Sequence, residues 1–179
     1  ADMNVLDSTG TMQAKINDLV PTSQPYGFPP YDYVGSESVV SVDTNVVDWV
    51  LVELSNPLNN DAVFAQQAAF VLTDGSIVST TGGPIVFVAP QVTWDVSIRH
   101  RNHLATVTDA PIDFSGGAGS FNFIDGWTGT PLGMKALGAD KYAMTPGDAN
   151  KDQSVTYAGL GNDRTAILSF LGGIGNTVN

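Results

Sequence analysis

The chain has 179 residues, 42% of them hydrophobic, with 7 Lys and Arg against 18 Asp and Glu, 19 Gly, 10 Pro and no Cys, so its formal net charge is −11 at pH 7. This length predicts one globular domain with a sizeable core. The acidic excess argues against nucleic acid and anionic membranes as partners, because both attract clustered Lys and Arg. Without Cys the chain can form no disulfide, thiolate nucleophile or zinc–thiolate site.

The first 35 residues are predicted to be irregular. Pro21, Pro25, Pro29 and Pro30 interrupt this segment, and proline removes backbone donors that a central strand needs. We therefore expect the segment to wrap over the surface of the fold, after a weak candidate strand at residues 12–16.

Short runs rich in Val, Ile, Phe and Trp then alternate with turn-forming residues, which is typical of strands. The predicted strands cover residues 38–42, 46–54, 63–72, 76–79, 85–88, 92–98 and 104–107. Residues 46–54, VVDWVLVEL, are largely apolar on both alternating faces and should form a central strand that buries Trp49. Trp94 is expected in the core as well. The Asp74-Gly75 pair between two apolar runs predicts a hairpin turn.

The spacing of these runs favours an all-β fold, an antiparallel β-sandwich of jelly-roll or immunoglobulin-like type. Of the 18 acidic residues 16 are Asp, and Asp prefers turns and caps to helices. The composition changes near residue 130, so we expect a β-sandwich domain at 1–130 and a C-terminal segment at 131–179. Helical segments are predicted only around 131–137 and 165–171.

A calcium site is predicted in the C-terminal segment. Oxygen-bearing side chains recur at alternate positions, at Asp148, Asn150 and Asp152, and the backbone carbonyl of Ser154 follows at position 7. A hard cation such as Ca²⁺ takes six to eight oxygen ligands, and a tight loop supplies them from alternate residues. Asp163, before the next apolar run, is predicted to close the site from the first turn of a helix.

The loop departs from the standard pattern at two positions. Gln153 stands where a glycine normally allows a sharp turn, and Gly159 stands where a bidentate carboxylate normally closes the site. We therefore interpret residues 157–162 as an insertion before Asp163. A turn rich in Asp and Asn that binds no metal is the alternative.

These motifs carry a resemblance to a known family. Residues 147–168, with Gly147-Asp148, Asn150, Asp152, Asn162-Asp163-Arg164 and Ile167-Leu168, resemble one repeat of a dockerin-type calcium loop. Upstream, NVVDWVLVEL at residues 45–54 and IRHRNHL at 98–104 look like a β-sandwich module of large secreted bacterial cell-surface proteins. The resemblance implies an extracellular, cell-surface location and a Ca²⁺ cofactor.

Two other groups of residues are candidates for function. Residues 98–104 hold both histidines, and a strand would place Arg99, Arg101 and His103 on one face and His100 with Asn102 on the other. The preferred interpretation is structural, with an arginine paired to one of the Asp residues; catalysis, metal binding or recognition of an acidic surface are the alternatives. Separately, Tyr26, Tyr31 and Tyr33 could form an exposed aromatic platform for a glycan.

The sequence thus predicts a secreted structural or adhesive protein. Its apolar ends, residues 1–16 and 167–174, predict assembly with copies of itself into a filament or surface layer, or with other envelope proteins. Low charge, at 14% of residues, and a start at Ala1 favour an exported, processed chain, and no run of 18 apolar residues predicts a membrane span. The alternative is a carbohydrate-binding module. No catalytic motif occurs, so an enzyme is not expected.

Overall fold

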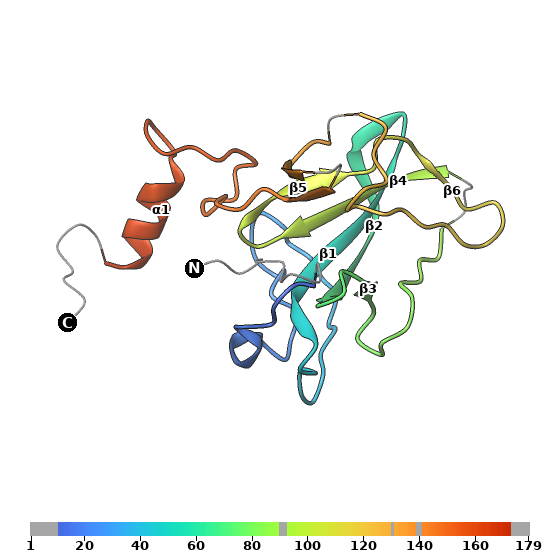
Figure 1. Ribbon diagram of the computed structural model, residues 1–179, viewed down its shortest axis with the longest axis horizontal. Helices are drawn as coiled ribbons and strands as arrows, with labels where there is room; N and C mark the ends of the chain where they lie inside the picture. The colour runs from blue at the N-terminus through green and yellow to red at the C-terminus, as the bar shows by residue number, and fades with distance from the viewer. Residues whose placement is uncertain (1–10, 90–92, 130, 139–140, 173–179) are drawn as a thin grey trace.

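The fold is all-β, as predicted, with antiparallel strands and one short α-helix (Figure 1). The computed structural model describes residues 11–89, 93–129, 131–138 and 141–172. In that part of the chain no helix combines the length and apolar character that crossing a bilayer requires. The elements are η1 (Asn17–Leu19), β1 (Val46–Asn56), β2 (Asn59–Leu72), β3 (Ile77–Val78), β4 (Thr93–His100), β5 (His103–Val107), β6 (Ile112–Asp113), β7 (Met134–Gly138), β8 (Lys141–Met144) and α1 (Asp163–Phe170).

Strand β1 lies at the centre of the main sheet. The strand order is β3-β2-β1-β4-β5, with β6 beside β4, and every pairing is antiparallel. All residues of β1 from Val46 to Ser55 are buried. The prediction of a central strand is confirmed, because side chains that are apolar on both faces need cover on both sides. The hairpin predicted at Asp74-Gly75 joins β2 to β3.

One face of the sheet packs against the proline-rich N-terminal segment. The Trp49 and Phe70 ring centroids lie 4.0 Å apart, and the Trp49 indole Nε1 donates to the Pro21 carbonyl at 2.7 Å. Tyr26 and Tyr33 from the same segment complete this cluster. The segment therefore covers the sheet without joining it, as its prolines predict.

The opposite face carries Val50, Val52 and Ile98. Loop side chains such as Phe123, together with Met144 of β8, pack against them. The β7–β8 hairpin is held to the sheet edge by the Leu104 amide, which donates to the Thr145 carbonyl at 2.9 Å. Within the described residues, this hairpin and segments without regular secondary structure cover the second face of the sheet.

Three of the predicted strands are wrong. Residues 12–16, 38–42 and 85–88 form no strand, apart from a single bridge at Ser38. Part of the last two runs nevertheless packs on the sheet as coil, Val39 and Val42 on one face and Ile85 and Phe87 on the other. Val40, Val86 and Val88 of the same runs are exposed. Burial accounts for these apolar runs without any ladder of hydrogen bonds.

The helix predicted at 131–137 is also wrong, since Met134–Gly138 is strand β7. Gly133 and Gly138 have φ values of +69° and +97°, which no helix contains, and Met134 pairs with Met144. The helix predicted at 165–171 is confirmed within two residues as α1. The domain boundary near residue 130 stays a prediction.

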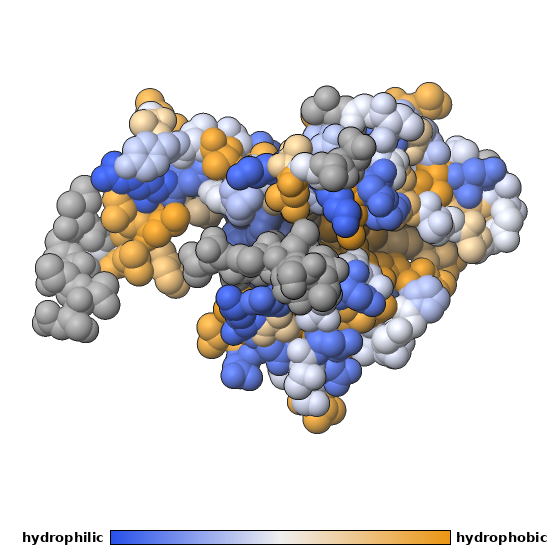
Figure 2. Space-filling model, viewed as in Figure 1, coloured by the Kyte–Doolittle hydropathy of each residue, from blue (hydrophilic) through white to orange (hydrophobic). Residues whose placement is uncertain are grey.

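Helix α1 lies to one side of the sheet, at the end of the loop that precedes it (Figure 1). The Asn162 side chain caps it by accepting the Thr165 amide at 2.9 Å. Phe170 is 91% exposed and Ile167 is 50% exposed. Hydrophobic side chains accordingly gather on the surface of the helix (Figure 2). The loop that begins at Asp148 lies between this helix and the sheet (Figure 1).

Candidate functional site

Asp163 closes the loop that begins at Asp148. Its Oδ1 accepts the Ala149 amide at 2.7 Å, and its Oδ2 accepts the Thr156 amide at 2.7 Å. Burial alone would raise the pKa of Asp163, but these backbone donors and that of Asn150 lower it below the usual range. The carboxylate therefore reaches across the loop from the first residue of α1.

Asp148 is the most deeply placed oxygen donor of the loop. It is 2% exposed, and its Oδ2 accepts the Gln153 amide at 3.3 Å. Its Oδ1 is buried and has no hydrogen-bond partner. Burial raises the pKa of Asp148, backbone donors oppose that rise, and the charges of Asp163 and Asp152 add to it. A buried carboxylate oxygen among other carboxylates is a fitting position for a cation.

Asn150 and Asp152 form the outer part of the loop. The Asn150 side-chain amide donates to Asp152 Oδ2 at 2.7 Å, and its Oδ1 accepts the Asp152 amide at 3.1 Å. Asp152 Oδ1 in turn accepts the Ser154 amide at 2.9 Å. Nothing here places the Ser154 carbonyl as a ligand, so that assignment stays a prediction.

The side-chain donors of this loop are oxygens, the ligand type that Ca²⁺ takes. Among the described residues, no three His, Cys, Asp or Glu side chains converge closely enough to hold a metal ion, so Asp148, Asp152 and Asp163 do not form a closed carboxylate cluster. The loop thus offers two buried carboxylates, Asp148 and Asp163, with Asp152 and Asn150 beside them.

The backbone of the loop turns sharply at positions that normally favour glycine. Lys151 and Gln153 have φ values of +65° and +67°, and Gly147 has a φ of +115°. Gln153 therefore adopts the left-handed conformation that glycine supplies at this position of a standard loop. The sequence departure is accommodated at a cost in backbone strain.

The loop is attached to the sheet at the turn between β4 and β5. The Gly147 amide donates to the Asn102 carbonyl at 2.9 Å. The Lys151 ammonium lies 5.5 Å from the centre of the Tyr31 ring, whose hydroxyl donates to the His100 carbonyl at 3.0 Å. Burial, together with the charge of Asp148, raises the pKa of Tyr31 to about 12. The loop of residues 148–163 and the sheet therefore share one contact surface.

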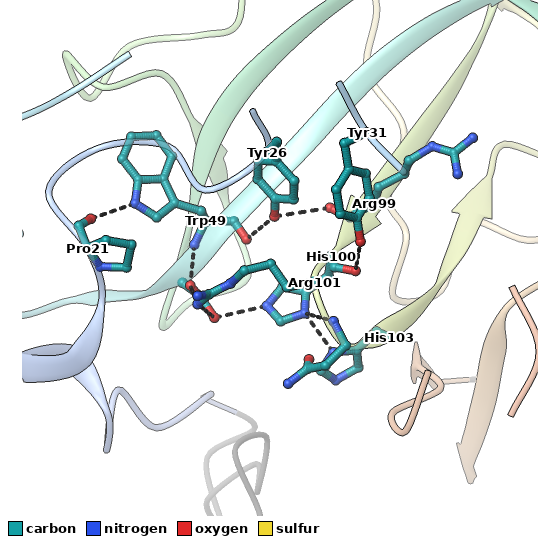
Figure 3. A network of polar contacts seen from close by, with 10 residues as sticks. Pro21, Tyr26, Tyr31, Trp49, Arg99, His100, Arg101 and His103 are labelled. Carbon is teal, nitrogen blue, oxygen red and sulfur yellow. Dashed lines mark hydrogen bonds and ion pairs between the residues drawn. The ribbon is translucent and has the colours of Figure 1, made fainter. Parts of the chain in front are cut away.

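Beneath this surface lies a buried polar network centred on Asp48 (Figure 3). Arg101 Nη2 donates to both Asp48 oxygens, at 2.6 and 2.7 Å, and His100 Nε2 lies 3.0 Å from Oδ2. The Trp49 amide donates to Oδ1 at 2.8 Å. Burial would raise the pKa of Asp48, but its bonds to His100 and Arg101 outweigh burial and lower it.

The two histidines contact each other through Nδ1 atoms 2.8 Å apart. One of these nitrogens must carry a hydrogen and the other must accept it. His100 is the acceptor when its Nε2–H donates to Asp48, and the Asn102 amide, 3.4 Å from His100 Nδ1, fits that tautomer. Burial, followed by the neighbouring His100, lowers the pKa of His103 to about 4. His103 is therefore neutral at pH 7.

The expected pairing of an arginine with an Asp is confirmed, by Arg101 with Asp48, while Arg99 pairs with Glu53 at 2.6 Å. The expected division of faces is wrong, because His100 and Arg101 both reach Asp48. A register irregularity between Ile98 and His100, followed by the turn, breaks the strand alternation. Asp48 itself was missed as the partner, although an Asp within an apolar strand signals a buried pair.

The predicted aromatic platform is wrong as an exposed surface. Tyr26 is 0% exposed and Tyr33 is buried. The Tyr26 hydroxyl donates to the Trp49 carbonyl at 2.8 Å, and the Tyr31 ring meets the edge of Tyr26 at 5.0 Å between centroids. These rings fasten the N-terminal segment to the sheet, so their faces are not available to a sugar ring.

No family model, curated protein or solved structure matches this chain.

Proposed function

We propose that this protein is a calcium-binding structural protein of a bacterial cell surface, which assembles with copies of itself. The observation that carries the calcium part is the buried Oδ1 atom of Asp148, which has no hydrogen-bond partner. Burial, followed by the nearby charges of Asp163 and Asp152, raises the pKa of this carboxyl group. A divalent cation would complete its coordination and offset the repulsion among the three carboxylates. Asn150 and the Ser154 carbonyl would supply further ligands.

We also infer that the fold is a β-sandwich with one reduced layer. The six-stranded sheet is the first layer, and the β7–β8 hairpin with its neighbouring loops is the second. Support comes from Met144 of β8, which packs on the Ile98 face of the sheet.

The self-assembly part rests on the exposed apolar side chains around α1. Phe170, Leu160 and Ile167 are each at least half exposed, and monomeric proteins seldom leave such a group uncovered. A second copy is the proposed occupant of this surface. Of the two apolar ends that the sequence singled out, residues 1–10 and 173–174 lie outside the described residues.

Calcium titration tests the first part. The thermal midpoint of the full chain should rise on adding Ca²⁺ and fall again with chelator, because the ion binds the folded loop. Asp148→Asn, which keeps the shape of the side chain, should abolish that response. Asp18→Asn at an exposed position should leave it intact. Equal midpoints with calcium and chelator in the unmodified chain would rule the site out.

Light scattering and electron microscopy test the second part separately. Phe170→Ser should lower the assembled mass while the calcium response of the thermal midpoint persists. Phe28→Ser removes an equally isolated ring, 77% exposed, from the N-terminal segment and serves as the matched control. A chain that is monomeric with and without calcium would overturn the assembly proposal and leave the calcium site standing.

A further inference from the structure

A groove of about 380 Å³ lies on the second face of the sheet. Val52 and Leu54 of β1 and Val96 of β4 line it from the sheet. Phe87 and Phe114 line it from segments without regular secondary structure. An apolar cavity of about 150 Å³ holds a benzene ring, so this groove has room for one aromatic ring with two aliphatic side chains beside it.

The groove is uncharged, although the chain is strongly acidic. None of the described residues that line it is Asp, Glu, Lys, Arg or His. Exposed carboxylates border it, because Asp113 follows the lining residue Ile112 and Asp125 follows the lining residue Ile124. The formal charge of −11 makes two copies repel each other over most of their surface. A partner for this groove therefore needs an apolar, uncharged face without acidic groups at its edge.

Helix α1 of the same chain presents an apolar face of this kind. Ile167, Phe170 and Leu171 are spaced i, i+3 and i+4, so they form one stripe at the C-terminal end of the helix. Phe170 is almost fully exposed, and the other two are about half exposed. No residue of α1 takes part in either hydrophobic cluster of the sheet. Helices that bind in apolar grooves use anchors with this spacing.

The charges of α1 suit the acidic border of the groove. Asp163 is buried, and its carboxylate accepts backbone amides of the loop. Arg164 in the first turn is exposed, with its guanidinium 5.5 Å from the centre of the Tyr157 ring, and residues 165–179 contain no charged residue. Among the residues of α1, all of which the structure describes, the one exposed charge is therefore positive. Opposite charges at the edge of a contact favour its formation and fix its orientation.

Helix α1 and the groove lie at different ends of the molecule (Figure 1). Strand β6, whose Ile112 lines the groove, lies at one end, and α1 lies at the other. The helix therefore does not reach the groove of its own chain, whereas the helix of a second copy has access to it. A contact between two different surfaces leaves a free helix and a free groove in every assembly, so the contact repeats.

We propose that the apolar stripe of α1, residues 167–171, binds in this groove of a second copy of the chain. Phe170 lies among the aromatic side chains of the groove, Ile167 and Leu171 pack beside it, and Arg164 faces the acidic border. This inference rests on the proposed self-assembly and names the surface of the second copy that α1 occupies. Repetition of the contact from head to tail produces a filament.

Light scattering of two full-chain variants and their mixture tests the contact. Phe170→Ser removes the anchor of the helix and leaves the groove intact. Ser120→Trp, at an exposed position that lines the groove, fills the groove and leaves the helix intact. Each variant alone should stay at the monomer mass at concentrations where the unmodified chain assembles. An equimolar mixture should reach about twice the monomer mass and grow no further, because one intact helix then meets one intact groove.

Matched controls separate the groove from its surroundings. Ser115→Trp adds the same ring at an exposed position outside the lining and should assemble like the unmodified chain. Phe87→Ser removes a lining ring and should raise the concentration needed for assembly about tenfold, as loss of a packed aromatic contact does. Val88→Ser, at the exposed neighbouring position, should leave that concentration unchanged. The comparison of Phe87→Ser with Val88→Ser decides the question if Ser120→Trp does not unfold cooperatively.

Three results would count against the proposal, and they differ in what they leave standing. Assembly of Ser120→Trp and Phe87→Ser at the same concentration as the unmodified chain would rule out the groove and leave assembly through α1 intact. A mixture that stays at the monomer mass would refute the head-to-tail contact. An unmodified chain that is monomeric at every concentration would overturn the proposed self-assembly together with this contact.

Discussion

Lowering the pH from 7 to 5 is expected to destabilise the folded chain through His103. Burial lowers the pKa of this imidazole to about 4 from its ordinary value of 6.5. Between these values the unfolded chain binds a proton that the folded chain does not, so the free energy of unfolding falls as the pH falls. The full difference is about 3 kcal/mol below pH 4, and about 2 kcal/mol of it is lost between pH 7 and pH 5.

Urea unfolding, followed by the fluorescence of the buried Trp49, measures this free energy at each pH. His103→Gln removes the titrating group and should flatten the dependence between pH 7 and pH 5, although the variant is less stable overall. The chain has only two histidines. Burial raises the pKa of Asp95 and Asp148, so these carboxyls act in the opposite direction as the pH falls, and the comparison with His103→Gln isolates the imidazole. A constant excess of chelator removes any contribution from calcium binding.

Asp48 acts at lower pH. Its pKa is lowered in the folded state, so its stabilising effect is present above its ordinary pKa of 3.8 and is lost only as the pH falls below that value. The two groups therefore act in separate windows. An unfolding free energy that stays constant from pH 7 to pH 5, or an equal slope in His103→Gln, would refute the reasoning.

Three further substitutions and one control test the backbone and the core, each by the unfolding free energy. Gln153→Gly should stabilise the loop by about 0.5–1 kcal/mol, because a φ of +67° suits glycine. Gly133→Ala should lower the unfolding free energy by more than about 2 kcal/mol, because the new Cβ would lie 1.9 Å from a carbonyl oxygen of β5. Gly82→Ala is the control: Gly82 also has a left-handed backbone but lies in open space, so the substitution should cost only about 1 kcal/mol. Tyr26→Phe should cost about 1–2 kcal/mol, because it leaves a buried carbonyl of β1 without its donor. A gain from Gly133→Ala, a loss from Gln153→Gly or a neutral Tyr26→Phe would each contradict the geometry.

The central part of the fold was predictable because one physical rule decides it. Residues 46–54 are largely apolar on both alternating faces, and a strand covered on both sides satisfies that pattern. The turn after β2 follows from Asp74-Gly75, since glycine accepts the φ of +87° found there. Helix α1 follows from a capping Asn162 before an apolar run.

Other elements were not predictable because their side chains are partly buried although their backbone forms no strand hydrogen bonds. Residues 38–42 and 85–88 have strand composition, yet they cover the sheet as coil. Composition detects that such side chains are buried, but it does not say whether their backbone pairs. The β7 strand was mistaken for a helix because its partner, β8, lies beyond the second of two left-handed glycines, Gly133 and Gly138.

For the candidate site, the spacing of residues was sufficient to predict contacts within the loop, but it did not predict contacts between residues far apart in the sequence. Asp148 and Asp163 could be associated from the loop pattern, and the backbone bonds of Asp163 now join the two ends of that loop. Asp48 lies 52 residues from His100 in sequence. No periodicity connects them, and only the β1–β4 register brings the two side chains together.

The turn between β4 and β5 connects the loop of residues 148–163 to the polar network. Gly147, beside Asp148, donates to Asn102, which lies between His100 and His103 in the turn between β4 and β5. The neighbouring bridge between His103 and Pro146 fixes the same turn from its other side. Ordering Asp148 around a cation would therefore hold the turn that positions His100 against Asp48 and His103 against His100. No group of the Asp48 network donates a hydrogen bond to Asp148 Oδ1. A cation bound at this oxygen would therefore break no hydrogen bond of the network, and its binding should add to the stability of the sheet.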